Sequence, residues 1–396
     1  MAPSAEPDII GSFYERHPYP PPIEDLAAVG HQWDEQRHRI EHHRLWPNLP
    51  YRGDRSILIA GCGTSQAAKY AVRWPKAAVV GIDISRTGVA NNRALAEQHD
   101  LANLELHELA IEEVATLERQ FDLIVCTGVL HHLADPELGL RALGKMMAPD
   151  GAMNLMVYGR YGRIGIEIMQ RYCRALGIEP SAGDMADLVA ALRELPLSHP
   201  IRPALSESPD FQDDDALADA LFNPRDRSYT VPEVLGLVEK GGLTFSHWFH
   251  QAPYLPDCGS LSALAHGSRI AELAPEQQYE AVELFRGTMS RHTVIAHRDQ
   301  SNTVSFADDV WLDYVPFRPP TAIAVTDRLP PGAAAALLNR AHQDRDLVFF
   351  VDQSQYDWFQ AVDGRRAVRD IAGHDRDFLE RLWRHDLIVI DASGGR

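Results

Sequence analysis

The chain has 396 residues and a formal net charge of −18 at pH 7, with 45% apolar and 24% charged residues. This length predicts two domains with an extension, and the composition excludes a disordered chain. The acidic charge repels a phosphate backbone, so nucleic acid is disfavoured as a partner. The four cysteines form no CxxC pair, which predicts reduced thiols and neither a disulfide framework nor a zinc site.

Membrane insertion and export are not expected. No stretch approaches the roughly 18–20 apolar residues that cross a bilayer, and residues 1–10 lack a basic segment followed by an apolar one. We therefore expect a cytoplasmic protein without a membrane partner.

Residues 1–50 are predicted to form an extension laid over the core. They are rich in proline, histidine and aromatic residues, and the stretch Ile23–Leu45 is compatible with a helix. His38, His42 and His43 have helical spacing, but no further residue of ligand type follows nearby. We expect no metal there.

From Ser56 onward, apolar runs alternate with turns and helical segments, a pattern typical of a parallel sheet covered by helices. The predicted helices are Gln66–Arg73, Arg86–His99 and Pro136–Met147, and Pro149-Asp150-Gly151 predicts a tight turn into the fifth strand. The predicted strands are Ser56–Ala60, Ala78–Ile82, Leu104–Glu108, Phe121–Cys126 and Ala152–Tyr158.

The alternation stops after Tyr158 and later resumes. Helices are predicted at Ile164–Leu176 and Ala186–Glu194, with Pro196–Asp226 as connecting sequence, so residues of about 160–230 form a helical insertion. The pattern then continues with Val231–Lys240 (helix), Leu243–Trp248 (strand), Pro275–Ser290 (helix) and Thr293–His297 (strand). The predicted fold for residues 51–300 is α/β, a Rossmann-like, mostly parallel sheet of seven strands.

A glycine loop follows the first predicted strand. Gly61-Cys62-Gly63 ends that strand, and Asp83 stands at the end of the next one, twenty residues after Gly63. Glycines let the backbone approach a ligand closely, and an acid at this place accepts hydrogen bonds from ribose hydroxyls. The pattern predicts a nucleoside site. A dinucleotide loop needs a third glycine where this chain has Gln66, which disfavours NAD.

These residues resemble the class I S-adenosylmethionine-dependent methyltransferases, of methyltransferase type 11/12. Ser65 departs from the family's frequent third glycine, but the resemblance continues at Ala110-Ile111-Glu112, Phe121 to Leu133 and Met147 to Gly151. It implies S-adenosylmethionine as cofactor and S-adenosylhomocysteine (AdoHcy) as product, with methyl transfer by in-line displacement. The implied cofactor-binding residues are Gly61, Cys62, Gly63, Gln66, Asp83, Ile84, Ala110, Ile111, Glu112 and Thr127, with Tyr14 and Tyr19 of the extension as a lid. Plain packing is the alternative for the two tyrosines.

In this family the loop after the fourth strand faces the methyl group, and here it carries His131 and His132. Either histidine is a candidate base, or both hold the loop in place. Tyr158, Arg160 and Arg163 follow at the end of the fifth strand. Arginine forks bind carboxylates, which indicates an anionic acceptor, a small molecule or a peptide. The alternative is that both arginines bond carbonyls and acids at the insertion junction. The catalytic candidates are His131, His132, Tyr158 and Arg160.

Residues 301–396 are predicted to form a small second domain. The stretch Trp358–Ile390 indicates helix, helix, strand and resembles the winged-helix modules of some bacterial enzymes. Its second helix carries Asp375, Asp377 and Glu380, which disfavours DNA binding, so we expect dimerisation, as in a homodimer, or substrate presentation. Two alternatives to a methyltransferase remain, an NAD-type oxidoreductase on the same fold and a non-catalytic protein that senses S-adenosylmethionine.

Overall fold

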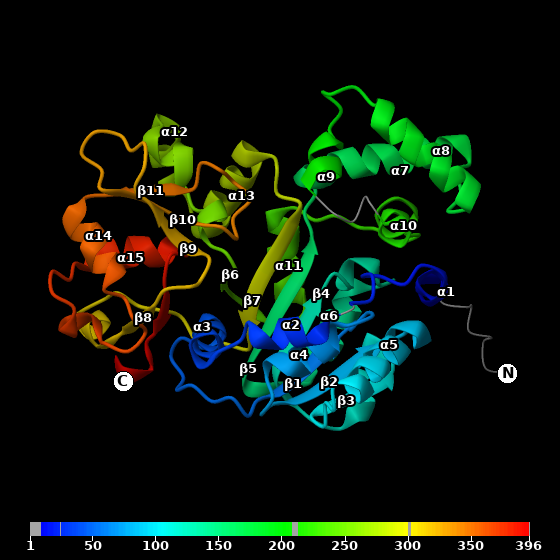
Figure 1. Cartoon of the computed structure of the whole chain (residues 1–396), viewed down its shortest axis with the longest axis horizontal. Coiled ribbons are helices and arrows are strands. Elements are labelled where there is room, and N and C mark those ends of the chain that lie inside the picture. The colour runs from blue at the N-terminus through cyan, green and yellow to red at the C-terminus, as the bar shows by residue number, and fades with distance from the viewer. Residues whose placement is uncertain (1–8, 24, 208–212, 300–301, 396) are drawn as a thin grey trace.

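The structure is a computed structural model that describes residues 9–23, 25–207, 213–299 and 302–395. A large sheet covered by helices occupies the centre, the helices of residues 164–222 stand beyond one end of it, and the C-terminal domain packs against the side (Figure 1). No helix within the described ranges is long and apolar enough to span a bilayer.

The central sheet has the strand order β3-β2-β1-β4-β5-β7-β6. Strands β1 to β5 are parallel, and β7 runs antiparallel to β5 and β6. This confirms the predicted Rossmann-like sheet of seven mostly parallel strands. The order reverses between β1 and β4, and ligands of such sheets bind at the carboxyl ends of the strands at that point. The strands are β1 (Ser56–Ala60), β2 (Ala78–Asp83), β3 (Leu104–Glu108), β4 (Phe121–Thr127), β5 (Met147–Tyr158), β6 (Thr244–Trp248) and β7 (Arg291–His297).

Strand β5 differs from the prediction at its start. It begins at Met147, so Pro149-Asp150-Gly151 lies inside the strand and is not a turn before it. Phe121 of β4 pairs with Met147, whereas Leu123 pairs with Ala152. Pairing therefore continues on both sides of the tripeptide, and the extra residues bulge out of the ladder.

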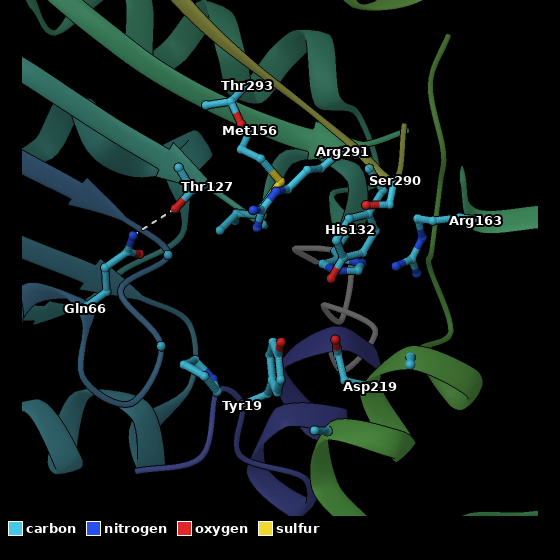
Figure 2. Close-up of a pocket in the computed structure, with 18 of the residues that line it drawn as sticks. Tyr19, Gln66, Thr127, His132, Met156, Arg163, Asp219, Ser290, Arg291 and Thr293 are labelled. Atoms are coloured by element: carbon cyan, nitrogen blue, oxygen red, sulfur yellow. Dashed lines mark hydrogen bonds between the residues drawn. The ribbon is translucent and has the colours of Figure 1, made fainter. Parts of the chain in front are cut away.

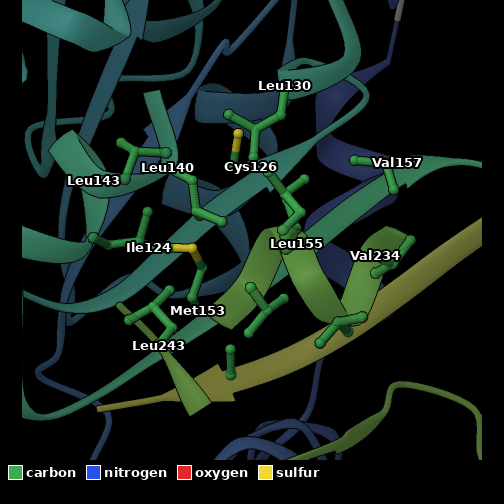
Figure 3. Packing of buried hydrophobic residues seen from close by; sticks show 14 of the residues in the cluster. Ile124, Cys126, Leu130, Leu140, Leu143, Met153, Leu155, Val157, Val234 and Leu243 are labelled. Carbon is green, nitrogen blue, oxygen red and sulfur yellow. The ribbon is translucent and has the colours of Figure 1, made fainter. Parts of the chain in front are cut away.

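Helices α4 (Gln66–Arg73), α5 (Arg86–Gln98), α6 (Pro136–Lys145), α11 (Val231–Lys240) and α13 (Pro275–Arg286) cover the sheet. Figure 3 shows the apolar core on the face that α6 and α11 cover, where Leu140, Leu143 and Val234 pack against Ile124 and Leu155. All five side chains are fully buried, and each such burial stabilises the fold by roughly 1.5–3 kcal/mol.

The insertion contains more helix than the sequence pattern predicts. Its helices are α7 (Ile164–Leu176), α8 (Ala182–Glu194), α9 (Arg202–Glu207) and α10 (Asp214–Phe222). The last two lie in the stretch expected to be connecting sequence, of which residues 208–212 are outside the described ranges. Helix α10 begins where the Asp213 carboxylate accepts a hydrogen bond from the Ala216 N–H, a strong capping interaction. Met169, Leu188 and Leu217 form a separate small core.

The N-terminal extension packs against α4 and α5 of the sheet domain, where Leu26 contacts Ala68 and Leu95. It contains α1 (Ile9–Arg16), α2 (Leu26–His31) and α3 (Glu35–Leu45), while residues 1–8 lie outside the described part of the chain. The histidines of α3 have structural partners: His38 bonds the Arg73 carbonyl, His42 bonds the Leu49 carbonyl, and His43 lies 3.2 Å from Asp391. Burial lowers the pKa of His42 to about 3 and that of His43 to about 4.

The C-terminal domain has its own core and two antiparallel sheets, ordered β11-β10-β9 and β12-β8. It is fixed to the sheet domain by Arg384, which forms two hydrogen bonds with Asp257, and by Asp386, whose carboxylate accepts from the Gln251 and Ala252 amides. The winged-helix resemblance stays a prediction. Its elements are β8 (Val315–Phe317), β9 (Ala322–Val325), β10 (Ala335–Asn339), β11 (Val348–Val351), α14 (Gln353–Gln360), α15 (Arg376–Arg384) and β12 (Val389–Asp391).

Candidate active site

A cavity of about 2110 Å³ lies at the carboxyl ends of β1, β2 and β4 and extends to the start of β7. The glycine loop, the N-terminal extension, the insertion and the C-terminal domain all contribute to its wall. Ordinary small-molecule sites measure roughly 300–1,000 Å³. The cavity therefore has room for two ligands side by side.

The glycine loop forms one wall, and glycine is required at both of its positions. Gly61 has φ +75° and Gly63 has φ +50°, values that other residues rarely adopt. A Cβ on Gly61 would lie 2.3 Å from Val129, and one on Gly63 would lie 3.0 Å from the Tyr19 carbonyl oxygen. The Thr64 hydroxyl donates to the Pro20 carbonyl at 2.6 Å, so the extension packs directly on this loop.

Asp83 lies at the end of β2 beside the loop. One carboxylate oxygen accepts from the Gly63 N–H at 2.7 Å and the other from the Ser85 N–H at 2.9 Å. Burial raises the pKa of this carboxyl, and the backbone hydrogen bonds oppose that rise. Each oxygen keeps a second lone pair. An acceptor of this kind on the cavity wall fits the two hydroxyls of a ribose.

The remaining predicted cofactor residues line the same end of the cavity. Figure 2 shows the Gln66 amide donating to the Thr127 hydroxyl, at 2.8 Å, which links the glycine loop to the end of β4. Burial raises the pKa of the Cys62 thiol, so that residue packs and does not act as a nucleophile. The structure brings together all twelve, namely Tyr14, Tyr19, Gly61, Cys62, Gly63, Gln66, Asp83, Ile84, Ala110, Ile111, Glu112 and Thr127.

Helix α1 joins the insertion to the cofactor end. The Tyr14 hydroxyl donates to Asp219 of α10 at 2.8 Å and accepts from the Asn223 amide at 3.0 Å. The next residue, Glu15, accepts hydrogen bonds from Ser85 and Thr87 at the start of α5. This position is consistent with the lid expected of Tyr14 and Tyr19, and its opening and closing stay a prediction.

The other end of the cavity carries His132 and Tyr158. The His132 Nδ1 lies 2.6 Å from the Arg225 carbonyl oxygen. A carbonyl can only accept, so Nδ1 carries the proton and Nε2 keeps a lone pair in the neutral ring. Burial raises the pKa of the Tyr158 hydroxyl. Both residues line the cavity.

The other catalytic candidates lie elsewhere. His131 is fully buried, has its ring centroid 3.9 Å from that of Tyr158, and is not among the residues that line the cavity. Arg160 is also absent from the lining and bonds Glu233 and the Ser228 carbonyl. Arg163 does line the cavity, but it pairs with Asp226 at 2.8 Å. The alternative for both arginines is bonding to carbonyls and acids at the insertion junction. Arg160 has an acid and a carbonyl as partners, and Arg163 has an acid.

Two groups of side chains offer three metal-ligand atoms within 4.8 Å of one another: His131, His132 and Asp226, and His250, His342 and Asp386. Asp226 already accepts from Arg163 and Gln170. Asp386 already accepts from two backbone amides and lies 2.9 Å from His342. Because both carboxylates have partners, we assign a metal to neither group.

Several residues of the cavity wall were missed by sequence reasoning. Figure 2 shows Met156, Ser290, Arg291 and Thr293 around the space that His132 also faces. The loop of residues 341–345 from the C-terminal domain completes this end. Ser290, Arg291, Thr293 and the loop lie more than 100 residues after the recognised motifs. Met156 lies within the predicted fifth strand, but the strand pattern does not show that its side chain lines a cavity.

Known proteins match this chain in sequence. A methyltransferase-domain family model matches residues 58–153. An uncharacterized protein of Synechococcus sp. is 31% identical over 294 residues, which is 72% of this chain and 70% of that protein. A ubiquinone biosynthesis O-methyltransferase of Neisseria meningitidis is 31% identical over 98 residues, 24% of this chain and 41% of that enzyme. This last match thus spans about two fifths of the enzyme's length.

A solved structure matches nearly the whole fold. PKMT2 from Rickettsia typhi, in complex with AdoHcy, superposes with a TM-score of 0.63 at 14% identity and covers 94% of this chain and 77% of that one. The likeness therefore includes the extension, the insertion and the C-terminal domain as well as the sheet. This likeness shows the fold. The methyltransferase-domain match over residues 58–153, together with the glycine-loop geometry, identifies the sheet domain as a class I S-adenosylmethionine-dependent methyltransferase domain, with S-adenosylmethionine as its cofactor.

Proposed function

We propose that this protein transfers the methyl group of S-adenosylmethionine to a small molecule or peptide that carries an anionic group. One observation carries the proposal. A single cavity combines the glycine loop and Asp83 at one end with His132, Tyr158 and Arg291 at the other. Cofactor and acceptor would thus have adjoining places in one cavity.

At the cofactor end, different residues would bind different parts of S-adenosylmethionine. Asp83 would hold the ribose, Gly61 and Gly63 would let the backbone approach the amino-acid tail, and residues 110–112 would flank the adenine. When bound, S-adenosylmethionine supplies an electrophilic methyl group for in-line displacement. The protein's task is to align the acceptor and exclude water, and Tyr14 and Tyr19, which line the cavity, would help to exclude water.

His132 is the group best placed to take a proton from the acceptor. Its Nδ1–H bond to the Arg225 carbonyl leaves Nε2 as an acceptor in the neutral ring. The same carbonyl stabilises the imidazolium that forms after proton transfer. A base of this kind is useful only when the nucleophile carries a proton that must leave, as a hydroxyl does.

The charge of the cavity favours an anionic acceptor. Although the whole chain carries −18, six basic residues line the cavity (Lys69, Arg73, Arg163, Arg225, Arg291 and Arg345) against four acidic ones (Asp83, Glu112, Asp219 and Asp344). A cavity with excess positive charge inside an acidic protein concentrates anionic ligands.

The test is transfer of tritium from methyl-labelled S-adenosylmethionine into fractions of a cell extract. We expect label in an acidic fraction, a rate lowered by about 10²–10⁴-fold in His132→Gln, and no change in His266→Gln, an exposed histidine outside the cavity. AdoHcy binding without transfer into any fraction would favour the sensor alternative. Binding of NADH without binding of AdoHcy would favour the oxidoreductase.

A further inference from the structure

The C-terminal domain reaches the acceptor end of the cavity through one loop. This loop connects β10 to β11, and its residues 341–345 line the cavity. It lies against the sheet domain, since the His342 ring is 5.5 Å from that of His250. The backbone next to His250 bonds β7, through the Phe249 N–H and the Thr293 carbonyl. The loop and the start of β7 therefore wall the same part of the cavity.

Two carboxylates hold this loop in a fixed position. Asp344 and Asp346 both pair with Arg286 of α13, at 3.4 and 3.0 Å. Asp346 also accepts from the N–H and the hydroxyl of Ser260. The residue between these two acids is Arg345. Arg286 and Ser260 are the partners of these carboxylates, and among the described residues neither carboxylate is ion-paired with the Arg345 guanidinium.

Among the described residues of the cavity wall, Arg345 and Arg291 are two arginines without an anionic partner. Within the described residues, neither side chain has a hydrogen bond, an ion pair or an aromatic ring that contacts it, and both are exposed on the cavity wall. Arg163, by contrast, is paired with Asp226. Figure 2 shows Arg291 beside Met156 and Ser290. Helix α13 ends at Arg286, and the segment 287–290 connects it to Arg291, the first residue of β7. Residues 287–290 also line the cavity.

We propose that Arg291 and Arg345 form an oxyanion-binding subsite, so that the C-terminal domain completes the acceptor site and selects acceptors that carry a carboxylate or a phosphate. Guanidinium groups bind both anions through paired, charge-assisted hydrogen bonds. The anchored loop holds Arg345 in place before the acceptor arrives, which reduces the entropy lost on binding. This inference rests on the proposed function, because it places the anion in the cavity that holds the cofactor.

The test measures binding of two probes, inorganic phosphate and glutarate, to the full-length protein saturated with AdoHcy at constant ionic strength. We expect calorimetry to detect one probe binding more tightly, which identifies the anion as phosphate or carboxylate. Arg291→Gln and Arg345→Gln should each weaken that binding by about tenfold or more, since one charge-assisted pair is lost. Arg345→Lys keeps the charge and should recover part of the affinity.

The matched control is Arg340→Gln, which removes the same charge from an exposed residue outside the cavity lining, five positions before Arg345. An equal loss in Arg340→Gln, no loss in Arg345→Gln, or no binding of either probe to the unaltered protein would overturn the inference. AdoHcy affinity is measured in the same samples. Failure of the unaltered protein to bind AdoHcy contradicts the proposed function, whereas intact AdoHcy binding with unaffected anion binding contradicts the subsite alone.

Discussion

Replacing Asp83 by alanine should weaken AdoHcy binding by about 100-fold. The carboxylate has one lone pair on each oxygen occupied by a backbone N–H, from Gly63 and from Ser85, which leaves two acceptor positions for a ribose. A hydrogen bond to a charged group contributes about 1.5–3 kcal/mol. Losing two such bonds at the lower end costs about 3 kcal/mol, which corresponds to about two orders of magnitude in Kd.

The assay is calorimetry with AdoHcy at pH 7.5, with thermal unfolding to show that the variant is folded. Glu113→Ala removes an exposed carboxylate that lies beside Glu112 but outside the cavity lining, and it should bind as the unaltered protein does. Burial raises the pKa of Asp83 above its ordinary value. AdoHcy affinity should therefore fall as the pH is lowered, because the Asp83 carboxyl takes up a proton. A folded Asp83→Ala variant with a Kd within threefold of the control would refute the assignment of the ribose to Asp83.

Three further predictions concern the lid, the glycine loop and acid stability. Tyr14→Phe removes the hydroxyl between Asp219 and Asn223, so AdoHcy release in stopped-flow experiments should be about tenfold faster; a rate equal to that of Tyr172→Phe, an exposed tyrosine, would contradict the lid. Gly61→Ala places a Cβ against Val129 at positive φ and should lower the free energy of unfolding by about 1–3 kcal/mol. Gly236→Ala, with open space around it, should not lower the free energy of unfolding. Equal urea midpoints of the two variants would contradict the loop geometry. Burial lowers the pKa of His43 to about 4, so the unfolded chain takes up this proton first. Between pH 7.5 and 4.5 the free energy of unfolding should therefore fall by about 2–3 kcal/mol less in His43→Gln than in the unaltered protein; an equal fall in both would contradict this assignment.

The sheet domain could be predicted from the sequence because its signals are local. Buried parallel strands such as β1 are short apolar runs, and α4 between β1 and β2 has clear helical periodicity. The bulge in β5 was missed because a Pro-Asp-Gly tripeptide is a turn signal unless neighbouring strands pair on both sides of it. Helices α9 and α10 were missed because short helices in an acidic, proline-containing stretch owe their stability to caps and to packing in the insertion.

The site was predictable at its cofactor end and less so at its acceptor end. Asp83 and the glycine loop are separated by a single helix and one strand, and their spacing along the chain is a usable signal. Arg160 and Arg163 follow the fifth strand, as the prediction of an anion site requires. The acids that pair with them, Glu233 and Asp226, lie more than 60 residues further along the chain, so the sequence does not show that both arginines are paired. Arg291 and Arg345 reach the cavity through tertiary contacts that no local pattern records.

A crystal structure of the full-length chain with AdoHcy tests the central claim most directly. The account predicts that the ribose hydroxyls bond the Asp83 carboxylate beside the Gly61 to Gly63 loop, with the sulfur directed toward the part of the cavity that His132 and Tyr158 line. An AdoHcy molecule bound outside this cavity, or one whose sulfur faces away from His132, would contradict it.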